Sequence, residues 1–346
     1  MWQPSLFRGQ RSAHHRRYIM GRLTKSLGVA AAAVTVTLVA ACSGGSSAGG
    51  GDGQLEQFRY LVPNSAGSGW DTTARTAAKI MEDDGIAQRI DVFNVDGANG
   101  TVGLSRLVDE KGNGELVMQM GFGLVAATVS QSSPVSFADT TPLVKLLDEY
   151  LAVVVPGDSP INSYDDLVTA WKKNPRLNVG GGSAIGGADN VATLQIAAAN
   201  GIPRGDVNYI TFGGSGVLPA VLGGQVDAAV TSAADVAEQV KSGDLKAVAI
   251  TGDERAHFLP DVPTLTEEGT EVVVANWRGV VAPPGINAES RQALIDAFDK
   301  MHQSEAWKSA VQSNGWIDAF MSGDEFGAYL AEQAGAIKAA LEGVQQ

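Results

Sequence analysis

Reactive side chains are scarce in this chain, which has one cysteine and four histidines among its 346 residues. His14 and His15 lie close to the N-terminus, while His257 and His302 stand alone, so no H-E-x-x-H or paired C-x-x-C spacing occurs. The chain also lacks a P-loop and a G-x-S-x-G nucleophile elbow. We therefore expect a protein that is not an enzyme and that holds no cofactor and no metal.

Basic residues are few as well, with 25 Lys and Arg against 38 Asp and Glu and a formal net charge of −13 at pH 7. Nucleic acid and anionic lipid headgroups attract clustered Lys and Arg, so neither is expected as a partner. Paired carboxylates can hydrolyse glycosides. Because acidic residues are so abundant, the sequence does not separate a catalytic pair from solvated charges, and an extracellular hydrolase stays open as an alternative.

The single cysteine, Cys42, follows an apolar run at 27–41 that is preceded by Arg22 and Lys25. A basic segment, an apolar run and small residues before a cut are typical of a secretory signal, and the run is short for a membrane span. A cysteine directly after the cut resembles the lipobox of bacterial lipoproteins. We expect a signal peptide at 1–41, lipidation at Cys42 and an extracytoplasmic protein held by a lipid anchor in the cell membrane.

The rest of the chain is long enough for two lobes. Residues 42–54 are rich in Gly and Ser and predict a flexible linker. The 305 residues from Cys42 onward exceed the size at which one hydrophobic core usually stops growing. We predict lobe 1 from residues 55–149 plus 276–346 and lobe 2 from 150–275, in a monomer whose chain crosses twice between the lobes and leaves a hinged cleft.

Apolar runs alternate with Gly-rich turns and amphipathic segments, which is typical of α/β folds with largely parallel sheets covered on both faces. We expect strands at 58–62, 90–94, 116–120, 146–155, 177–180, 208–211, 228–231 and 247–251. We expect helices at 70–83, 101–109, 165–174, 188–200, 288–303 and 324–342, with a short one ending at 222. The long apolar runs 146–155 and 272–281 are the expected crossings.

Four Gly- and Ser-rich loops lead from a strand into a helix, at 63–72, 97–103, 181–189 and 213–219. Glycine allows main-chain amides to approach a ligand closely, and the first turn of a helix offers unpaired donors at a positive dipole end. Each loop alone could be a tight turn. Four of them in two lobes favour the binding of an anion.

Five stretches, in order, resemble motifs of one family. Residues 62–75 resemble the opening P-x-x-x-G-G-x-x-D-x-x-A-R of the solute-binding proteins of tripartite tricarboxylate transporters, the TctC or Bug family. The others are N-x-x-G-A-x-G at 94–100, G-S-x-x-x-x-A at 182–188, a segment ending L-G-G-x-V-D at 213–227 and W-x-G-x-x-A-P-x-G at 277–285. The resemblance covers residues 58–340.

The resemblance implies a Venus-flytrap fold of the periplasmic-binding-protein type 2 class, with two Rossmann-like α/β lobes. Such a protein captures a small organic acid, a di- or tricarboxylate or an aromatic carboxylate, and presents it to membrane permease subunits without chemistry. The ligand contacts that it implies are Ser65, Ala66, Gly67, Ser68, Trp70 and Asp71 in the first loop, Ala98, Asn99 and Thr101 in the second, and Ser183, Ala184, Gly213 and Ser215 in the opposing lobe.

Several points stay open at this level. Trp70 could line the pocket or cover lobe surface, and Arg278 could reach the cleft or pair with a carboxylate. Arg75 lies four residues after Asp71, which favours an ion pair between them. A binder of amino acids or phosphate-like ligands is the alternative function, with Asp71 as the partner of an ammonium group.

Overall fold

The computed structural model describes residues 55–213 and 216–342. The predicted signal peptide, Cys42, the linker and Ser215 lie outside these ranges. Within them, no helix is both long and apolar enough to cross a membrane.

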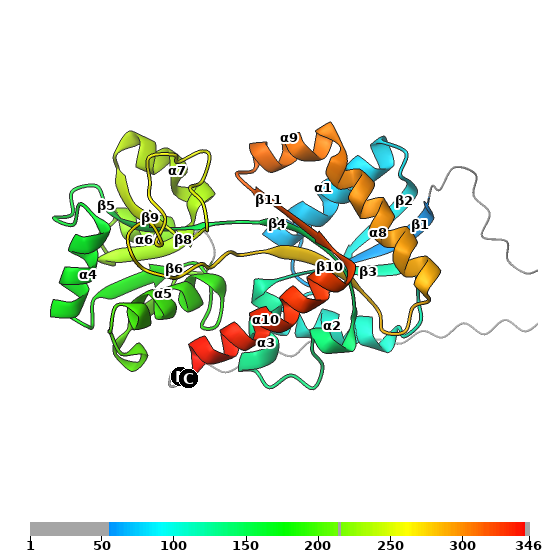
Figure 1. Ribbon diagram of the computed structural model, residues 1–346, viewed down its shortest axis with the longest axis horizontal. Coiled ribbons are helices and arrows are strands. Elements are labelled where there is room, and N and C mark those ends of the chain that lie inside the picture. Colours follow the sequence, from blue (N-terminus) through cyan, green and yellow to red (C-terminus); the bar gives the residue numbers. More distant parts are fainter. Residues whose placement is uncertain (1–54, 214–215, 343–346) are drawn as a thin grey trace, which may run out of the picture. The chain divides into compact units, whose positions relative to one another are not determined.

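The first sheet has six strands, in the order β11-β4-β10-β3-β1-β2 (Figure 1). Their bounds are β1 (Leu55–Val62), β2 (Ala87–Asn94), β3 (Leu116–Gly121), β4 (Thr141–Asp148), β10 (Arg278–Ala282) and β11 (Ile317–Ser322). Strand β1 runs parallel to β2 and β3. Strand β10 runs antiparallel to β3 and β4, and β11 runs antiparallel to β4.

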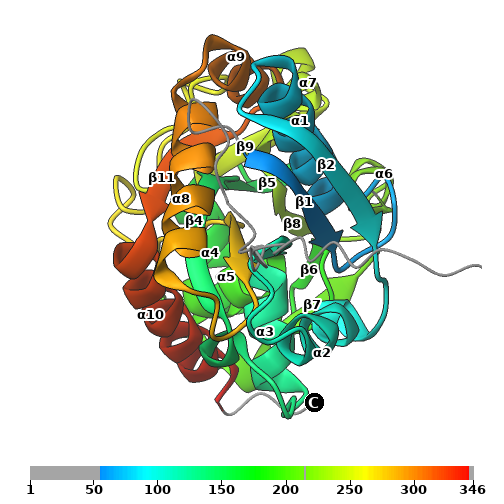
Figure 2. The same ribbon diagram turned by 90° about the vertical axis from the view of Figure 1, so that its right-hand side faces the viewer.

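Helices cover both faces of the first sheet. One face carries α1 (Gly69–Asp83), α8 (Ala288–Gln303) and α9 (Glu305–Ser313), and the other carries α2 (Thr101–Asp109), α3 (Phe122–Ser130) and α10 (Gly323–Leu341) (Figures 1 and 2). Alternation along β1 sends Phe58 and Tyr60 into the core under α1 and α8, and Leu61 into the core on the opposite face. Both faces are therefore apolar.

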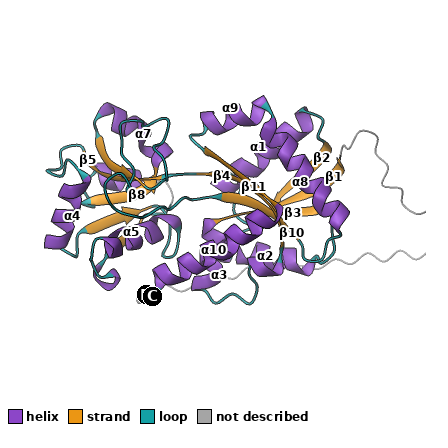
Figure 3. Cartoon of the chain, in the orientation of Figure 1, coloured by secondary structure: helices purple, strands orange, loops and turns teal. Residues whose placement is uncertain are grey.

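The second sheet has five strands, in the order β7-β6-β8-β5-β9. They are β5 (Leu151–Pro156), β6 (Asn178–Gly181), β7 (Asn208–Thr211), β8 (Ala228–Ser232) and β9 (Leu245–Ile250). Its helices are α4 (Tyr164–Lys173), α5 (Ala188–Ala199), α6 (Val217–Leu222) and α7 (Ala233–Ser242) (Figures 1 and 3). Val153 packs with the core that includes α4 and α5, whereas its neighbours Ala152 and Val154 pack with α6 and α7.

Both sheets are mixed, so the prediction of largely parallel sheets is wrong in this respect. In the first sheet only the pairs of β1 with β2 and β3 are parallel, and in the second sheet only the pairs of β6 with β7 and β8 are parallel, while β5 runs antiparallel to β8 and β9. A parallel pair needs a crossover that returns the chain to the same end of the sheet. Strands β5 and β10 are each entered directly from the other sheet instead, and therefore run against their neighbours.

The two connections between the sheets lie side by side. The predicted strand 146–155 is wrong, because β4 ends at Asp148 and β5 begins at Leu151. Tyr150, between them, forms a β-bridge with Ala275 of the returning segment. The main-chain amide of Asn276 donates to the carbonyl oxygen of Glu149 at 2.9 Å. This pairing joins the two crossing segments.

Candidate functional site

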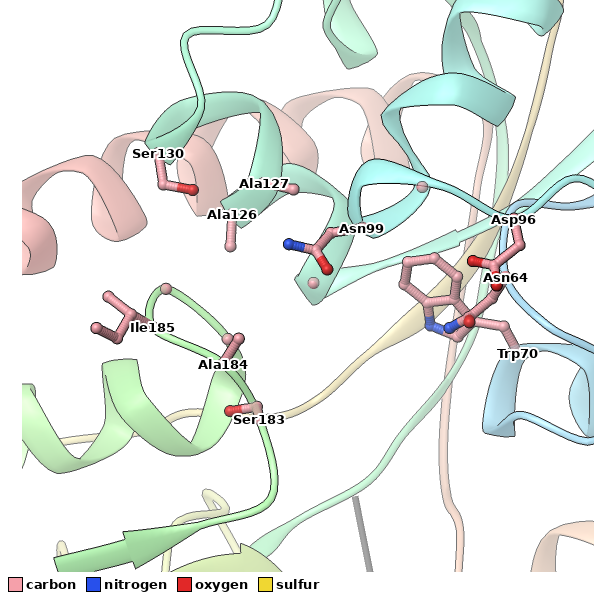
Figure 4. A pocket seen from close by; sticks show the side chains of 14 residues that line it. Asn64, Trp70, Asp96, Asn99, Ala126, Ala127, Ser130, Ser183, Ala184 and Ile185 are labelled. Atoms are coloured by element: carbon pink, nitrogen blue, oxygen red, sulfur yellow. The ribbon is translucent and has the colours of Figure 1, made fainter. Parts of the chain in front are cut away.

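A cavity of about 230 Å³ lies where loops from both sheets meet (Figure 4). Its walls are the loop between β1 and α1, the loop between β2 and α2, one face of α3, and the loop between β6 and α5. The lining residues are Asn64, Trp70, Asp96, Asn99, Gly100, Gly123, Ala126, Ala127, Ser130, Ser183, Ala184, Ile185, Gly186 and Gly187.

The loop before α1 contains a tight turn. The Ser68 amide donates to the Ser65 carbonyl at 3.2 Å, and Gly67 has φ = +81°. A positive φ at the third position defines a type II turn with Ala66 at its second position. The Gly67 amide donates to Asp71 Oδ2 at 2.9 Å, and the Ser68 hydroxyl accepts from the Asp71 amide as the N-cap of α1.

Asp71 is buried and fully engaged inside its own lobe. Besides the Gly67 amide, its carboxylate accepts from Arg75 Nε at 2.9 Å and from Asn94 Nδ2 at 2.9 Å. Burial raises the pKa of Asp71, but the bonds from Arg75, Gly67 and Asn94 outweigh it and hold the pKa below its usual value. The predicted ion pair with Arg75 is confirmed. Asp71 therefore fixes the loop, and it does not line the cavity.

The loop before α5 repeats this turn in the second lobe. The Gly187 amide donates to the Ala184 carbonyl at 2.8 Å, and Gly186 has φ = +86°, so Ile185 occupies the second position of a type II turn. The Gly186 amide donates to Asn190 Oδ1 at 2.9 Å. As in the first loop, the third amide of the turn is bound by a side chain four residues later.

Asp189 holds the base of this second turn. Its Oδ2 accepts from the amides of Gly182 at 2.7 Å and Ser183 at 2.9 Å, and the Tyr209 hydroxyl donates to the Ser183 carbonyl at 2.7 Å. Burial raises the pKa of Asp189 to about 6; the two amides offset part of that rise, and the charge of Glu149 adds to it. Unlike Asp71, Asp189 has no ion pair with any residue in the described part of the chain.

The indole ring of Trp70 packs against three glycines, which we call the glycine seat. A Cβ at Gly121 would lie 2.9 Å from Trp70 Nε1, one at Gly100 would lie 3.3 Å from Cζ3, and one at Gly123 would lie 3.7 Å from Cζ2. The ring lines the cavity and also packs against the apolar cores on both faces of the first sheet. Trp70 thus forms part of the cavity wall and of the lobe packing, and its contact with a ligand stays a prediction.

The loop between β2 and α2 is left-handed over four consecutive residues. Gly97, Ala98, Asn99 and Gly100 have φ of 137°, 46°, 54° and 94°. Left-handed backbone is costly for residues with a Cβ and is often found at functional sites. It presents the Asn99 side-chain amide to the cavity (Figure 4).

One face of α3 forms the remaining wall. Gly123, Ala126, Ala127 and Ser130 follow the spacing i, i+3, i+4 and i+7, which places them on one side of a helix. Their small side chains leave room for a ligand. This helix is not among those predicted from the sequence, although small residues recur in it at helical spacing.

Main-chain donors of three loops are unpaired at or beside the cavity. Among the residues that the structure describes, the amides of Ala66, Ala98, Asn99, Ala184 and Ile185 have no hydrogen-bond partner. Three of these residues, Asn99, Ala184 and Ile185, line the cavity directly. The arrangement can hold an anion from two lobes at once.

Of the residues predicted to contact ligand, Trp70, Asn99, Ser183 and Ala184 line the cavity. Others lie in the same loops without lining it, namely Ser65, Ala66, Gly67, Ser68, Asp71, Ala98 and Thr101. Gly213, which follows β7, is also outside the lining. The lining also includes residues that were not predicted as ligand contacts, namely Asn64, Asp96 and the turn Ile185–Gly187.

Arg278 pairs with a carboxylate and does not reach the cavity. Its Nη2 pairs with Glu149 Oε2 at 2.9 Å, and its Nη1 donates to Thr73 Oγ1 at 2.8 Å and to the Gly69 carbonyl at 3.1 Å. The side chain is buried and does not line the cavity. It connects the crossing segment at Glu149 to the start of α1.

A family model described as tripartite tricarboxylate transporter family receptor matches residues 73–344. The chain belongs to this family. BugT of Bordetella pertussis is 27% identical to the receptor over 287 residues, which cover 79% of this chain and 84% of BugT. Members of the family are solute receptors and not enzymes, so the hydrolase alternative is excluded.

Solved structures share the fold of the receptor. A TctC solute-binding protein from Polaromonas, without ligand, superposes with a TM-score of 0.73 at 25% identity, covering 83% of this chain and 98% of its own. MatC from Rhodopseudomonas palustris with bound malate gives 0.68 at 21% identity, covering 83% and 99%. Rpa4515 of R. palustris with adipate gives 0.70 at 19% identity, covering 83% and 96%.

Proposed function

We infer that the receptor captures a small organic acid, a di- or tricarboxylate or an aromatic carboxylate, between its two lobes. It then delivers the acid to the membrane subunits of a tripartite tricarboxylate transporter. The observation that carries this function is the set of unpaired amides, from both lobes, around a cavity lined by no Lys, Arg or His among the described residues. In such a cavity a carboxylate finds its donors on the main chain.

The two type II turns are the central elements of this site. Each turn leaves the amide of its second residue, Ala66 or Ile185, without a partner in the described chain, at the start of a long helix whose dipole favours negative charge. The malate bound to MatC and the adipate bound to Rpa4515 are carboxylates, which supports the same ligand class here.

The other predicted contacts belong to the same proposal. Closure of the lobes around the acid would bring the flanking residues of the loops to it, from Ser65 to Ser68, at Ala98 and Thr101, and at Gly213 and Ser215. The crossing segments at Glu149–Tyr150 and Ala275–Asn276 would act as the hinge. The receptor would work as a monomer outside the cytoplasm, tethered by a lipid on Cys42 through the linker at 42–54.

A single amide can be removed from the site by substitution with proline. Proline favours the second position of a type II turn, so Ile185→Pro fits the backbone while deleting the Ile185 amide hydrogen. Ile185→Ala removes the side chain and keeps that amide. We expect calorimetry against a panel of di-, tri- and aromatic carboxylates to show one bound acid per chain, with affinity lowered about tenfold or more by Ile185→Pro and little by Ile185→Ala.

Binding only to sugars, metal cations or polymers would refute the organic-acid function. Equal affinities in the proline and alanine variants would refute the role of the amide while leaving the ligand class intact.

A further inference from the structure

Asp96 is the one formally charged side chain among the described residues that line the cavity. Its Oδ1 accepts from the Gly97 amide at 2.8 Å, and its second oxygen has no partner in the described chain. Asp96 is an exposed residue in the wall of the cavity, so this oxygen is accessible to a ligand whose other contacts are hydrogen-bond donors. This charge is out of place if the ligand is only an anion.

Asp96 is accompanied by Trp70 and Asn64. In Figure 4 these three side chains lie together on one side of the cavity, and the loop with Ser183, Ala184 and Ile185 lies on the other. An indole face attracts cations electrostatically, and the three glycines behind Trp70 fix the position of its ring. A carboxylate next to an aromatic face is a suitable environment for an ammonium group.

Asp71 does not compete for this role. Its carboxylate is saturated by Arg75, Asn94 and the Gly67 amide, so it has no oxygen to offer a ligand. The ammonium partner that the amino-acid alternative places at Asp71 is therefore better assigned to Asp96.

We propose that the acid captured by this receptor also carries a protonated amine, so that the ligand is an amino acid. Its carboxylate binds the unpaired main-chain amides, and its ammonium group binds Asp96 against the face of Trp70. This inference rests on the proposed function, because it names the second charged group of the same ligand. A plain diacid would direct its second carboxylate toward Asp96, where like charges repel.

The experiment compares acids that differ by one ammonium group. The probes are aspartate with succinate, glutamate with glutarate, and phenylalanine with 3-phenylpropionate, each titrated by calorimetry into the full soluble receptor. We expect an amino acid to bind about tenfold or more tightly than its deaminated partner. In Asp96→Asn, which keeps an oxygen for the Gly97 amide, this ratio should fall to near one through loss of amino-acid affinity.

Asp91→Asn is the matched control, because it removes the same charge from an exposed position on β2 outside the cavity lining. It should leave the ratio unchanged. Plain acids that bind as well as amino acids, or a preference that survives Asp96→Asn, would overturn this inference while the organic-acid function stands. Failure of all six probes to bind would overturn both.

Discussion

Two buried carboxylates, Asp71 and Asp189, hold the binding loops, and their pKa values are shifted in opposite directions. Asp71 contacts the guanidinium of Arg75, and its pKa lies below the usual value. Within residues 55–213 and 216–342, the Asp189 carboxylate is held by main-chain amides without a cation; burial raises its pKa, and the like charge of Glu149 adds to that rise. Ionised Asp71 therefore stabilises the loop before α1, whereas ionisation of Asp189 destabilises the loop before α5.

The pKa of Asp189, about 6 in the folded protein against 3.8 for a free side chain, predicts a pH dependence of stability. The folded state binds the proton of Asp189 more tightly than the unfolded state does. Protonated Asp189 therefore adds about 3 kcal/mol to the free energy of unfolding below pH 3.8, and this contribution is lost as the pH rises to 6. The Asp189→Asn variant has no carboxyl group to ionise at this position. Its stability relative to that of the wild type should therefore rise between pH 4 and pH 8, because only the wild type loses this contribution.

Urea unfolding at pH 4, 6 and 8 measures this difference. Asp166→Asn is the control of opposite sign: bonds from the Asn162 amide and from Ser163 lower the pKa of Asp166, so its contribution is lost as pH falls below the usual value. A stability difference for Asp189→Asn that does not change with pH would contradict the prediction.

At the scale of elements, the left-handed loop at 97–100 is the most constrained segment of the site. A Cβ at Gly100 would lie 3.1 Å from Leu124 Cδ1 and 3.2 Å from the Pro63 carbonyl oxygen, in addition to meeting Trp70, and Gly100 has φ = +94°. The loop thus combines a backbone that favours glycine with a lack of space for any side chain.

Gly100→Ala should therefore destabilise the protein by about 2–4 kcal/mol and weaken ligand binding, because it adds crowding to the cost of left-handed backbone. Gly201→Ala is its control, since Gly201 has φ = +74° and nothing within 4 Å of the added Cβ. The control should cost about 1–2 kcal/mol and leave ligand affinity unchanged. Equal losses in thermal or urea unfolding would show that crowding at Gly100 has no effect.

Several helices with one polar face were predicted from the sequence, although α7 and α9, which also carry charged residues, were not. The helices at 101–109 and 288–303 have the predicted bounds. Helix α3 was not predicted, because its run Phe122–Ser130 has no charged residue and therefore shows no solvent face. The crossing was predicted within the run 146–155, but the break between β4 and β5 was not. Apolar strands lie on both sides of Glu149–Tyr150, so periodicity does not show where one strand ends.

The site was predictable to the level of loops. Gly-rich turns mark where a backbone can approach a ligand, so the loops at 63–72, 97–103 and 181–189 could be identified. Which residue of each loop faces the cavity depends on turn geometry and on contacts distant in sequence. Asp71, for example, turns into its own lobe because Arg75 and Asn94 donate hydrogen bonds to its carboxylate. Asp96, which no motif marks, lines the cavity.

At the scale of the whole described chain, the ion pair of Arg278 with Glu149 joins the crossing segments to the first lobe. Glu149 also accepts from Asn276 Nδ2 at 2.8 Å. Burial raises the pKa of Asp235 on α7, the charge of Glu149 adds to that rise, and Arg278 partly offsets it. Arg278 thus balances acidic groups that belong to both lobes.

Arg278→Met should destabilise the protein by about 3 kcal/mol, because it leaves the carboxylate of Glu149 buried without a cation. Glu149→Gln keeps an oxygen for Asn276, and the double variant should lose less than the sum of the single variants, by about 1 kcal/mol or more. Urea unfolding of the four proteins gives this coupling energy. Additive losses would mean that the two charges do not stabilise each other.

The glycine seat of Trp70 has a consequence for how this receptor can diverge. A methyl group fits at Gly123, 3.7 Å from the indole. At Gly121 and Gly100 it would meet the main-chain oxygens of Trp277 and Pro63 as well as the indole, so a smaller residue at 70 does not by itself make room there. Gly100 and Gly121 are therefore expected to stay glycine even where residue 70 changes. A homologue with a smaller residue at position 70 would have a flat extension of the cavity where the indole lies here, and this one substitution would admit bulkier ligands.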